Sequence, residues 1–137
     1  MASFNIANLA LSDTTVVHLK NADGSYLYAD AAEKEPLEVE VYGRSSKQMR
    51  NYLVAAEKKK AKRSKGRKDY QPTPEEAQED NAEFFAAITK SVKNFDLGNG
   101  PLVTAEDFKE MYMNPALYFL LDQVSEILGD NEVFMKR

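Results

Sequence analysis

The chain has 137 residues, of which 43% are hydrophobic and 29% are charged, and its net charge is −4. This length and composition predict one globular domain with one modest core, and they exclude a largely disordered chain. The absence of cysteine excludes disulfides, thiolate metal sites and a cysteine nucleophile. No apolar run is long enough to cross a membrane, and the first residues lack the basic start of a secretory signal, so we expect a soluble cytoplasmic protein.

The N-terminal third predicts a loose arm followed by a small antiparallel β-meander. Residues 1–12 are weakly patterned, and three apolar residues can attach this arm to the body: Phe4, Ile6 and Leu9. Apolar and polar residues then alternate in three short runs that predict strands, one from Thr14, one over 25–29 and one over 37–42. The meander spans residues 14–42 and needs a helix against its apolar face, because so small a sheet is marginally stable alone.

A helix with a basic end is predicted over residues 45–64. Ser45 and Gln48 have the spacing of a capping box, and one apolar face follows at helical intervals: Met49, Tyr52, Leu53 and Ala56. Eight of the eleven residues over 58–68 are Lys or Arg. Residues 65–73 contain glycine and proline and are expected to form a flexible link.

An acidic helix is predicted over residues 74–95. The run Thr73-Pro74-Glu75-Glu76 combines an N-cap, a proline at the first helical position and a capping-box glutamate. Residues at helical spacing are expected to face the core: Ala77, Phe84, Phe85, Ile88, Val92 and Phe95. A turn over 97–101, which includes Asn99, separates this helix from the next.

The last third predicts a helical pair over residues 104–129. Thr104 is placed as an N-cap, Asn114-Pro115 restarts the helix, and Gly129 is placed as a left-handed C-cap. Residues 117–121 are apolar on every side, so part of this turn should meet a second surface. In total, the elements predict an α+β domain over residues 1–137, mainly helical with about four helices and a small N-terminal antiparallel β-meander.

The residues give little support for an enzyme. The single histidine, His18, lies on the polar face of a predicted strand and is expected to be exposed to solvent. Asp23-Gly24 and Asn99-Gly100 are better explained as turns than as phosphate-binding loops, and no nucleotide-binding motif occurs. We therefore expect no catalytic residues, no metal site and no cofactor.

Two features leave alternatives open. The basic run over 58–68 can bind phosphates, or it can be a solvated helix end that the following acidic segment partly neutralises. No aromatic residues are interleaved to stack on bases, so nucleic acid is not the expected partner. The apolar turn over 117–121 can be core, or it can be a groove or oligomer contact in which methionines and aromatics adapt to a partner.

The order of several short motifs resembles the tail assembly chaperones of long-tailed bacteriophages. Tyr42-Gly43-Arg44 precedes the basic-ended helix, and a Pro-Glu-Glu acidic helix with Phe84-Phe85 follows. The C-terminal motifs are Met111-Tyr112-Met113-Asn114-Pro115, Leu121-Asp122-Gln123-Val124 and a closing Gly129-Asp130-Asn131 with Phe134. Two residues separate Asn131 from Phe134, which departs from the adjacent pair of the family.

The resemblance implies a non-enzymatic role in phage tail assembly. Such chaperones coat the long helical tape measure protein in the host cytoplasm, keep it soluble, help to recruit the tail tube protein, and are absent from the mature virion. The candidate apolar contacts are Tyr112, Tyr118, Phe119, Leu120 and Phe134. The candidate electrostatic contacts, with a client or a sister subunit, are Lys58, Lys59, Lys60, Lys62 and Arg63.

Two other functions and one further contact remain open from the residues. One alternative is a structural protein that is retained in the tail, and the other is a small nucleic-acid-binding regulator that uses the basic run. The exposed apolar turn and the oppositely charged segments also favour a homo-oligomer. No membrane contact is expected.

Overall fold

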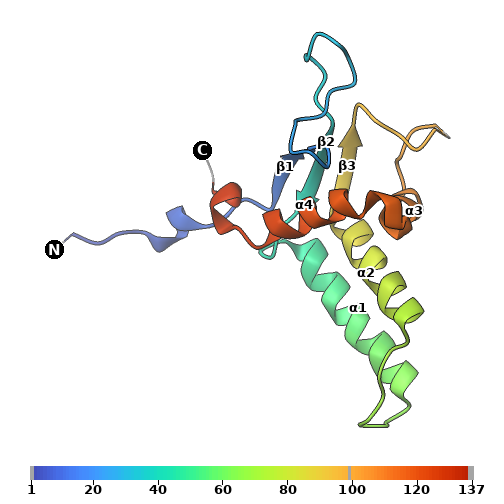
Figure 1. Ribbon diagram of the computed structural model, residues 1–137. Coiled ribbons are helices and arrows are strands. Elements are labelled where there is room, and N and C mark those ends of the chain that lie inside the picture. Colours follow the sequence, from blue (N-terminus) through green and yellow to red (C-terminus); the bar gives the residue numbers. More distant parts are fainter. Residues whose placement is uncertain (1, 99, 136–137) are drawn as a thin grey trace.

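The computed structural model describes residues 2–98 and 100–135, and within them it has an α+β fold (Figure 1). Its strands are β1 (Thr14–His18), β2 (Glu38–Tyr42) and β3 (Thr89–Lys93). Its helices are α1 (Lys47–Ser64), α2 (Pro74–Ile88), α3 (Ala105–Met113) and α4 (Tyr118–Leu128). Three short 3-10 turns are η1 (Ile6–Leu9), η2 (Pro115–Leu117) and η3 (Asn131–Phe134). The predicted class and its four helices are confirmed for the described residues.

The sheet is antiparallel in the order β1-β2-β3, and it recruits its third strand from the middle of the chain. Val17 pairs with Val39, and Val39 pairs with Val92, which places one apolar row across all three strands. The prediction of a helix over 74–95 is therefore wrong beyond Ile88. Val92 fits both a helical face and an alternating strand, and the β-branched residues at this point favour the strand.

The predicted strand over 25–29 forms only isolated bridges within a long connection between β1 and β2. Three leucines of this connection are joined by backbone hydrogen bonds. Leu27 donates to Leu19 over 3.0 Å, Leu19 donates to Leu37 over 2.9 Å, and Leu37 donates to Leu27 over 3.0 Å. In place of a middle strand, the chain thus has a three-leucine ladder that extends the sheet. The sheet is not strictly N-terminal, because its third strand, β3, follows α2.

Local side-chain bonds fix the starts of the helices. Thr73 forms the predicted capping box with Glu76, and Thr104, predicted as an N-cap, also forms a capping box with Asp107. The cap predicted at Ser45 is wrong by one residue, because Ser46 accepts from the amide of Met49 over 3.2 Å and α1 begins at Lys47.

Gly129 ends α4 without the predicted left-handed conformation. Its φ is −83°, which is ordinary right-handed backbone, and its amide donates to the carbonyls of Glu126 and Ile127. The prediction of a left-handed cap is therefore wrong. Asp130 begins the next turn instead, by accepting from the amide of Glu132 over 3.0 Å.

The core lies between the inner face of the sheet and α2, α3 and α4 (Figure 1). α1 and α2 run side by side and project together from this body, which leaves the outer side of α1 open. Leu53, predicted on the core face, is 52% exposed for this reason. A chain of aromatic contacts connects the projecting pair to the core: Tyr52 to Phe84, Phe84 to Phe85, and Phe85 to Tyr112. Among the described helices, none is both long and apolar enough to cross a membrane.

Candidate partner-binding site

Two of the five predicted apolar contacts are core residues. Tyr112 is 3% exposed, and its hydroxyl lies 2.7 Å from the hydroxyl of Thr89. Burial raises the pKa of Tyr112 to about 12. Phe134 is also 3% exposed, and its ring packs on Gly43 so closely that a Cβ there would lie 2.6 Å from the ring. Their assignment to a partner surface is wrong, because Phe85 of α2 and Thr89 cover Tyr112, while Phe134 packs against Gly43.

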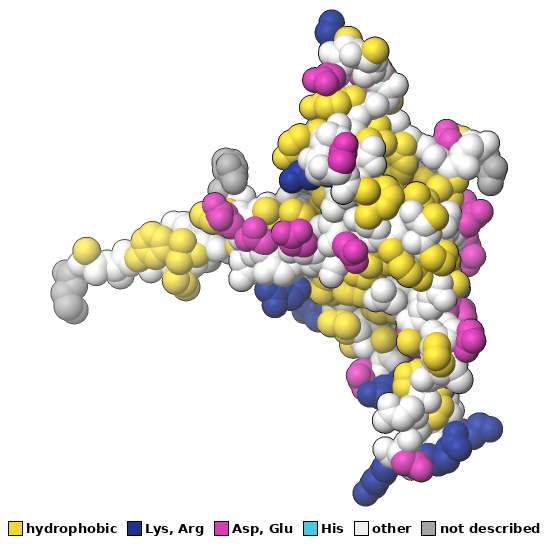
Figure 2. Space-filling view, viewed as in Figure 1, with side chains coloured by type: hydrophobic (Ala, Val, Ile, Leu, Met, Phe, Trp, Pro, Cys, Tyr) yellow, Lys and Arg dark blue, Asp and Glu magenta, His cyan; other side chains and the backbone are white. Residues whose placement is uncertain are grey.

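Phe119 and Leu120 line an apolar groove, whose cavity volume is about 290 Å³. The groove lies between the start of α4, the three-leucine ladder and the segment after β3. Its apolar lining, which defines the groove in all that follows, is Leu19, Leu27, Leu37, Phe95, Leu97, Met111, Leu117, Phe119 and Leu120. Asn21 and Asp96 add polar groups to this lining. Figure 2 shows hydrophobic side chains gathered beside the start of α4 and the neighbouring strand ends.

Tyr118 belongs to a different hollow from its two neighbours. It is 36% exposed and lines a cavity of about 380 Å³ together with Gln78, Asn81 and Asp122. This second hollow is more polar than the groove because amide and carboxylate groups line it. The apolar turn predicted to meet a second surface therefore faces two hollows, and the groove is the more apolar of them.

Gln123 holds α4 beside the leucine ladder. Its side-chain oxygen accepts from the amide of Lys20, and its side-chain nitrogen donates to the carbonyl of Lys20, both over 2.7 Å. The side chain thereby makes the two hydrogen bonds that a neighbouring strand would make, and it satisfies the backbone amide and carbonyl of Lys20. Sequence reasoning missed this contact, although a glutamine inside an apolar helical stripe was a visible signal.

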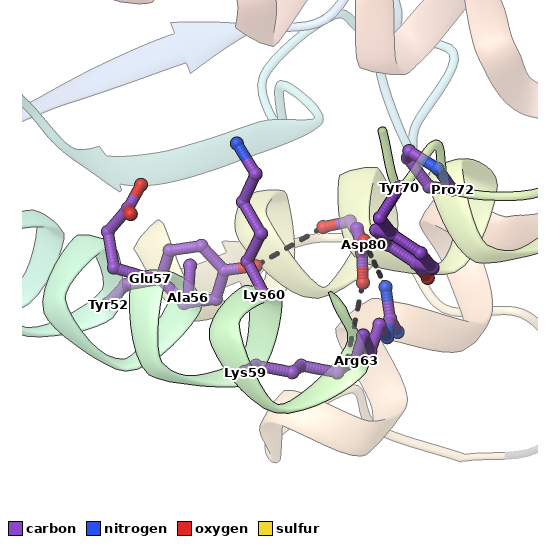
Figure 3. Close-up of a pocket in the computed structure, with 9 residues that line it drawn as sticks. All are labelled: Tyr52, Ala56, Glu57, Lys59, Lys60, Arg63, Tyr70, Pro72 and Asp80. Atoms are coloured by element: carbon purple, nitrogen blue, oxygen red, sulfur yellow. Dashed lines mark hydrogen bonds and ion pairs between the residues drawn. The ribbon is translucent and has the colours of Figure 1, made fainter. Parts of the chain in front are cut away.

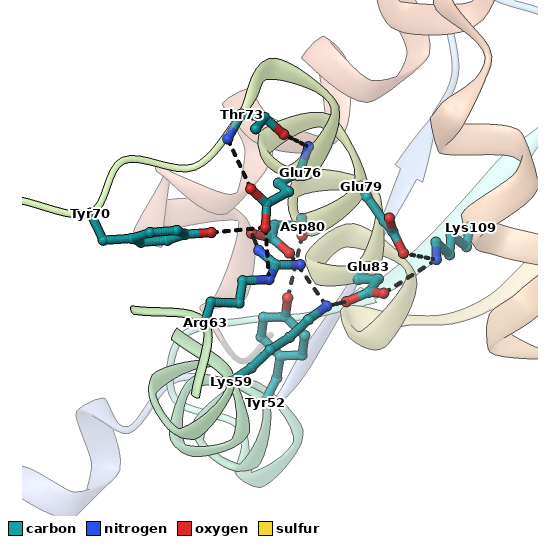
Figure 4. Close-up of polar contacts among 10 residues, drawn as sticks. All are labelled: Tyr52, Lys59, Arg63, Tyr70, Thr73, Glu76, Glu79, Asp80, Glu83 and Lys109. Carbon is teal, nitrogen blue, oxygen red and sulfur yellow. Dashed lines mark hydrogen bonds and ion pairs between the residues drawn. The ribbon is translucent and has the colours of Figure 1, made fainter. Parts of the chain in front are cut away.

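The predicted cations divide into two groups. Arg63 binds Asp80 over 2.6 Å and Glu76 over 3.2 Å, and Lys59 binds Glu83 over 2.8 Å (Figure 4). These contacts join α1 to α2, and Lys109 of α3 joins the same cluster. Its amine lies 3.2 Å from Glu83. The hydrogen bond from Lys59 lowers the pKa of Glu83, with Lys109 adding to the effect.

The other candidate cations lie at the far end of the projecting helices. Within the described residues, no ion pair is formed by Lys58, Lys60 or Lys62. Figure 2 shows Lys and Arg side chains gathered at this end of the molecule. Lys59 and Arg63 therefore stabilise the helical pair. Lys58, Lys60 and Lys62 are exposed, and we call these three residues the basic tip.

A hollow of about 300 Å³ separates α1 from α2 near this tip (Figure 3). Tyr52 and Tyr70 form much of its wall. The hydroxyl of Tyr52 donates to the Asp80 carbonyl over 3.3 Å, and that of Tyr70 donates to Glu76 over 2.8 Å. Tyr70 lies in the predicted flexible link, so this bond attaches the link to α2. We assign the hollow a structural role because its main polar groups already bind each other.

His18 is not the solvent-exposed side chain that was expected. Its ring is half-buried and stacks on Tyr26, with 4.5 Å between ring centroids, and the edge of Tyr28 lies nearby. Its Nε2 lies 2.9 Å from the carbonyl of Leu27. The connection between β1 and β2 folds back over the strand and covers the ring. No group of three metal-ligating side chains occurs in the described part of the chain, and the turn predicted at Asn99 lies outside it.

Three comparisons with known proteins, by family models, by curated sequences and by solved structures, found no match to this chain.

Proposed function

We propose that this protein is a non-enzymatic tail assembly chaperone of a long-tailed bacteriophage. It binds the tape measure protein, keeps it soluble in the host cytoplasm, helps to recruit tail-tube subunits, and leaves before the virion is complete. The order of sequence motifs around Tyr112, Gln123 and Phe134 supports the family, and the apolar groove supports the mode of binding.

The groove is the observation that carries this proposal. A tape measure protein is long and helical, and an amphipathic helix binds by placing apolar anchors at helical spacing into such a groove. At about 290 Å³ the groove lies at the lower end of the range for ligand pockets, so it suits a few side chains of one client segment. Met111 gives the lining an adaptable side chain, which helps one groove to accept several segments of a long client.

The basic tip supplies a second, electrostatic contact. Lys58, Lys60 and Lys62 are exposed on α1, which projects beyond the body (Figure 1), so an acidic stretch of the client can reach them. Exposed charges of this kind increase the rate of association more than they increase affinity. Neutralising them is expected to slow client binding at low salt and to have little effect at high salt.

Co-expression with the long helical protein encoded next downstream tests the proposal. We expect the client to be soluble with this chain and to aggregate without it. Phe119→Asp should abolish the rescue because it places a charge in the groove, whereas Tyr118→Asp should retain it because Tyr118 lines the other hollow. A client that stays soluble without this chain contradicts the proposal.

Circular dichroism melting separates a groove defect from misfolding. Phe119→Asp should show the cooperative melting of a folded protein. If it is unfolded at the expression temperature, its loss of rescue reflects lost core packing and not a blocked groove. In that case the smaller change Leu120→Ser is used, with the same expected loss of rescue.

Two other measurements separate this function from its alternatives. A structural tail protein is present in purified virions at a stoichiometric level, whereas the proposed chaperone is absent from them. A nucleic-acid-binding regulator binds DNA or RNA with a steep dependence on salt, and it loses this binding when the basic tip is neutralised.

A further inference from the structure

The N-terminal arm, residues 2–12, presents apolar side chains that its own body does not cover. Phe4 is 66% exposed, Ile6 is 72% exposed and Leu9 is 63% exposed. The arm contains no charged residue, in a chain that is 29% charged. Such a segment lacks the solvating charges of a disordered tail and has the composition of a docking segment.

The arm contains a capped 3-10 turn, η1, and extends away from the body. Asn5 caps the η1 turn by accepting from the amide of Ala7 over 3.1 Å, so a local bond shapes the backbone that carries Ile6 and Leu9. The arm is anchored where the amide of Ser12 donates to the carbonyl of Phe134 over 2.7 Å. From this point it extends outward (Figure 1), and hydrophobic side chains cover much of its surface (Figure 2).

The apolar groove lies at the opposite end of α4 from this anchor. Phe119 and Leu120 are in the first turn of α4, while Phe134 follows its last turn. An arm that bound its own groove would have to reverse its direction and pass the whole helix. The chain therefore carries an exposed apolar segment and an open apolar groove that face different directions.

The geometry points to an exchange between copies of this chain, in which the arm of one copy occupies the apolar groove of the next. Phe4, Ile6 and Leu9 are the anchors, and the half-buried lining around Leu27, Phe119 and Leu120 receives them. Because the anchor of the arm and the groove lie at opposite ends of α4, the contact is heterologous, and repeating it builds a ring or an open chain of copies. Both surfaces are thereby covered when no client is present.

Sedimentation velocity over a series of concentrations tests the exchange. The wild-type protein should form dimers and longer species as its concentration rises. The double variant Phe4→Ser, Ile6→Ser should weaken this association by roughly 100-fold, because two buried apolar side chains are lost. Val103→Ser is the matched control, since Val103 is 71% exposed but lies outside both the arm and the groove, and it should associate as the wild type does.

Cross-linking identifies the two surfaces in contact. Because the chain has no cysteine of its own, only the introduced cysteines can form disulfides. An Ile6→Cys protein mixed with an Asp96→Cys protein should form an intermolecular disulfide, since Asp96 lies at the groove. Mixing Ile6→Cys with Ser91→Cys should form much less, because Ser91 is on an exposed part of β3 that is not part of the groove.

Three results overturn the exchange. They are a wild-type protein that stays monomeric at every concentration tested, equal cross-linking to Asp96→Cys and Ser91→Cys, and closure of the disulfide within one monomer of an Ile6→Cys, Asp96→Cys variant. None of these measurements needs a client, so they are independent of the co-expression test. If the exchange occurs and the client is not rescued, the chaperone proposal fails alone; if the client is rescued by a strict monomer, the exchange fails alone.

Discussion

The buried hydroxyl of Tyr112 makes the stability of this fold sensitive to high pH. Burial raises the pKa of Tyr112 to about 12, above the ordinary value of 10.0. The folded state therefore keeps its proton at pH values where the unfolded chain loses it. The resulting stabilisation is complete below pH 10 and is lost as the pH rises toward the folded-state pKa.

We predict that Tyr112→Phe reduces this alkaline loss. Between pH 9 and pH 11 the wild type should lose about 1 kcal/mol more stability than the variant, measured by urea unfolding. At pH 8 the variant should be less stable by about 1 kcal/mol, because the bond to Thr89 is lost. Tyr118→Phe is the control, and a variant with the same alkaline loss as the wild type contradicts the prediction.

The contact of Phe134 with Gly43 gives a second test at single-residue scale. A Cβ at position 43 would lie 2.6 Å from the ring, so Gly43→Ala forces the ring or the strand end to move. We predict a loss of about 1–3 kcal/mol in the free energy of unfolding. Gly129→Ala should have a neutral or slightly stabilising effect, because its φ is −83° and the nearest atom is 3.5 Å away. Equal effects of the two substitutions would falsify this packing account.

At the scale of elements, Glu83 connects three helices. It binds Lys59 of α1 over 2.8 Å and Lys109 of α3 over 3.2 Å, while it lies on α2 itself. Its side chain is 29% exposed, so solvent screens both pairs to some degree. The projecting helical pair is thereby fastened to the body by side chains from all three elements.

We predict that Glu83→Gln lowers the free energy of unfolding at pH 7 by about 1 kcal/mol and that the loss is smaller in 1 M salt. The pKa of Glu83 is lowered, so its stabilisation is present above its ordinary value of 4.5 and disappears as the pH falls through the folded-state value. The variant and the wild type should therefore converge in acid. Glu57→Gln on the exposed side of α1 should change little, and an equal loss there would point to a general charge effect.

Elements set by local bonds were predictable, and elements set by distant partners were not. The caps at Thr73 and Thr104 depend on a residue three positions away, and both were predicted. β3 was predicted as helix because Val92 fits both periods, and its strand pairing with Val39 comes from a distant part of the sequence. Leu53 has a helical core spacing, yet no element covers its side of α1.

Only the side of the groove formed by α4 was predictable from the sequence. Apolar crowding at the start of α4 predicted a partner surface, and Phe119 and Leu120 do line a groove there, whose binding of a partner stays a prediction. The opposite wall comes from the leucine ladder, which the bond between Gln123 and Lys20 brings to α4 across 103 positions of sequence. Gln123 stands out in the sequence, but its partner Lys20 does not. Tyr112 and Phe134 could not be distinguished from groove residues because distant residues cover them, namely Phe85 and Thr89 for Tyr112 and Gly43 for Phe134.

At the scale of the whole molecule, the two proposed working surfaces lie at different places on the fold. The groove lies beside the start of α4, and the basic tip lies at the end of the projecting helices (Figures 1 and 2). A long client can contact both, and the apolar contact is expected to supply most of the affinity. α1 also exposes two apolar side chains, Leu53 and Val54. The central claim is that the groove, and not these residues of α1, receives the client.

Methyl NMR of leucine-labelled protein tests this claim most directly. The groove contains Leu27 and Leu120, whereas Leu53 is exposed on α1 at 52% and serves as an internal control. On titration with an apolar helical segment of the tape measure protein, we predict large shifts for Leu27 and Leu120 and none for Leu53. Shifts at Leu53 with unchanged signals from Leu27 and Leu120 would contradict the account.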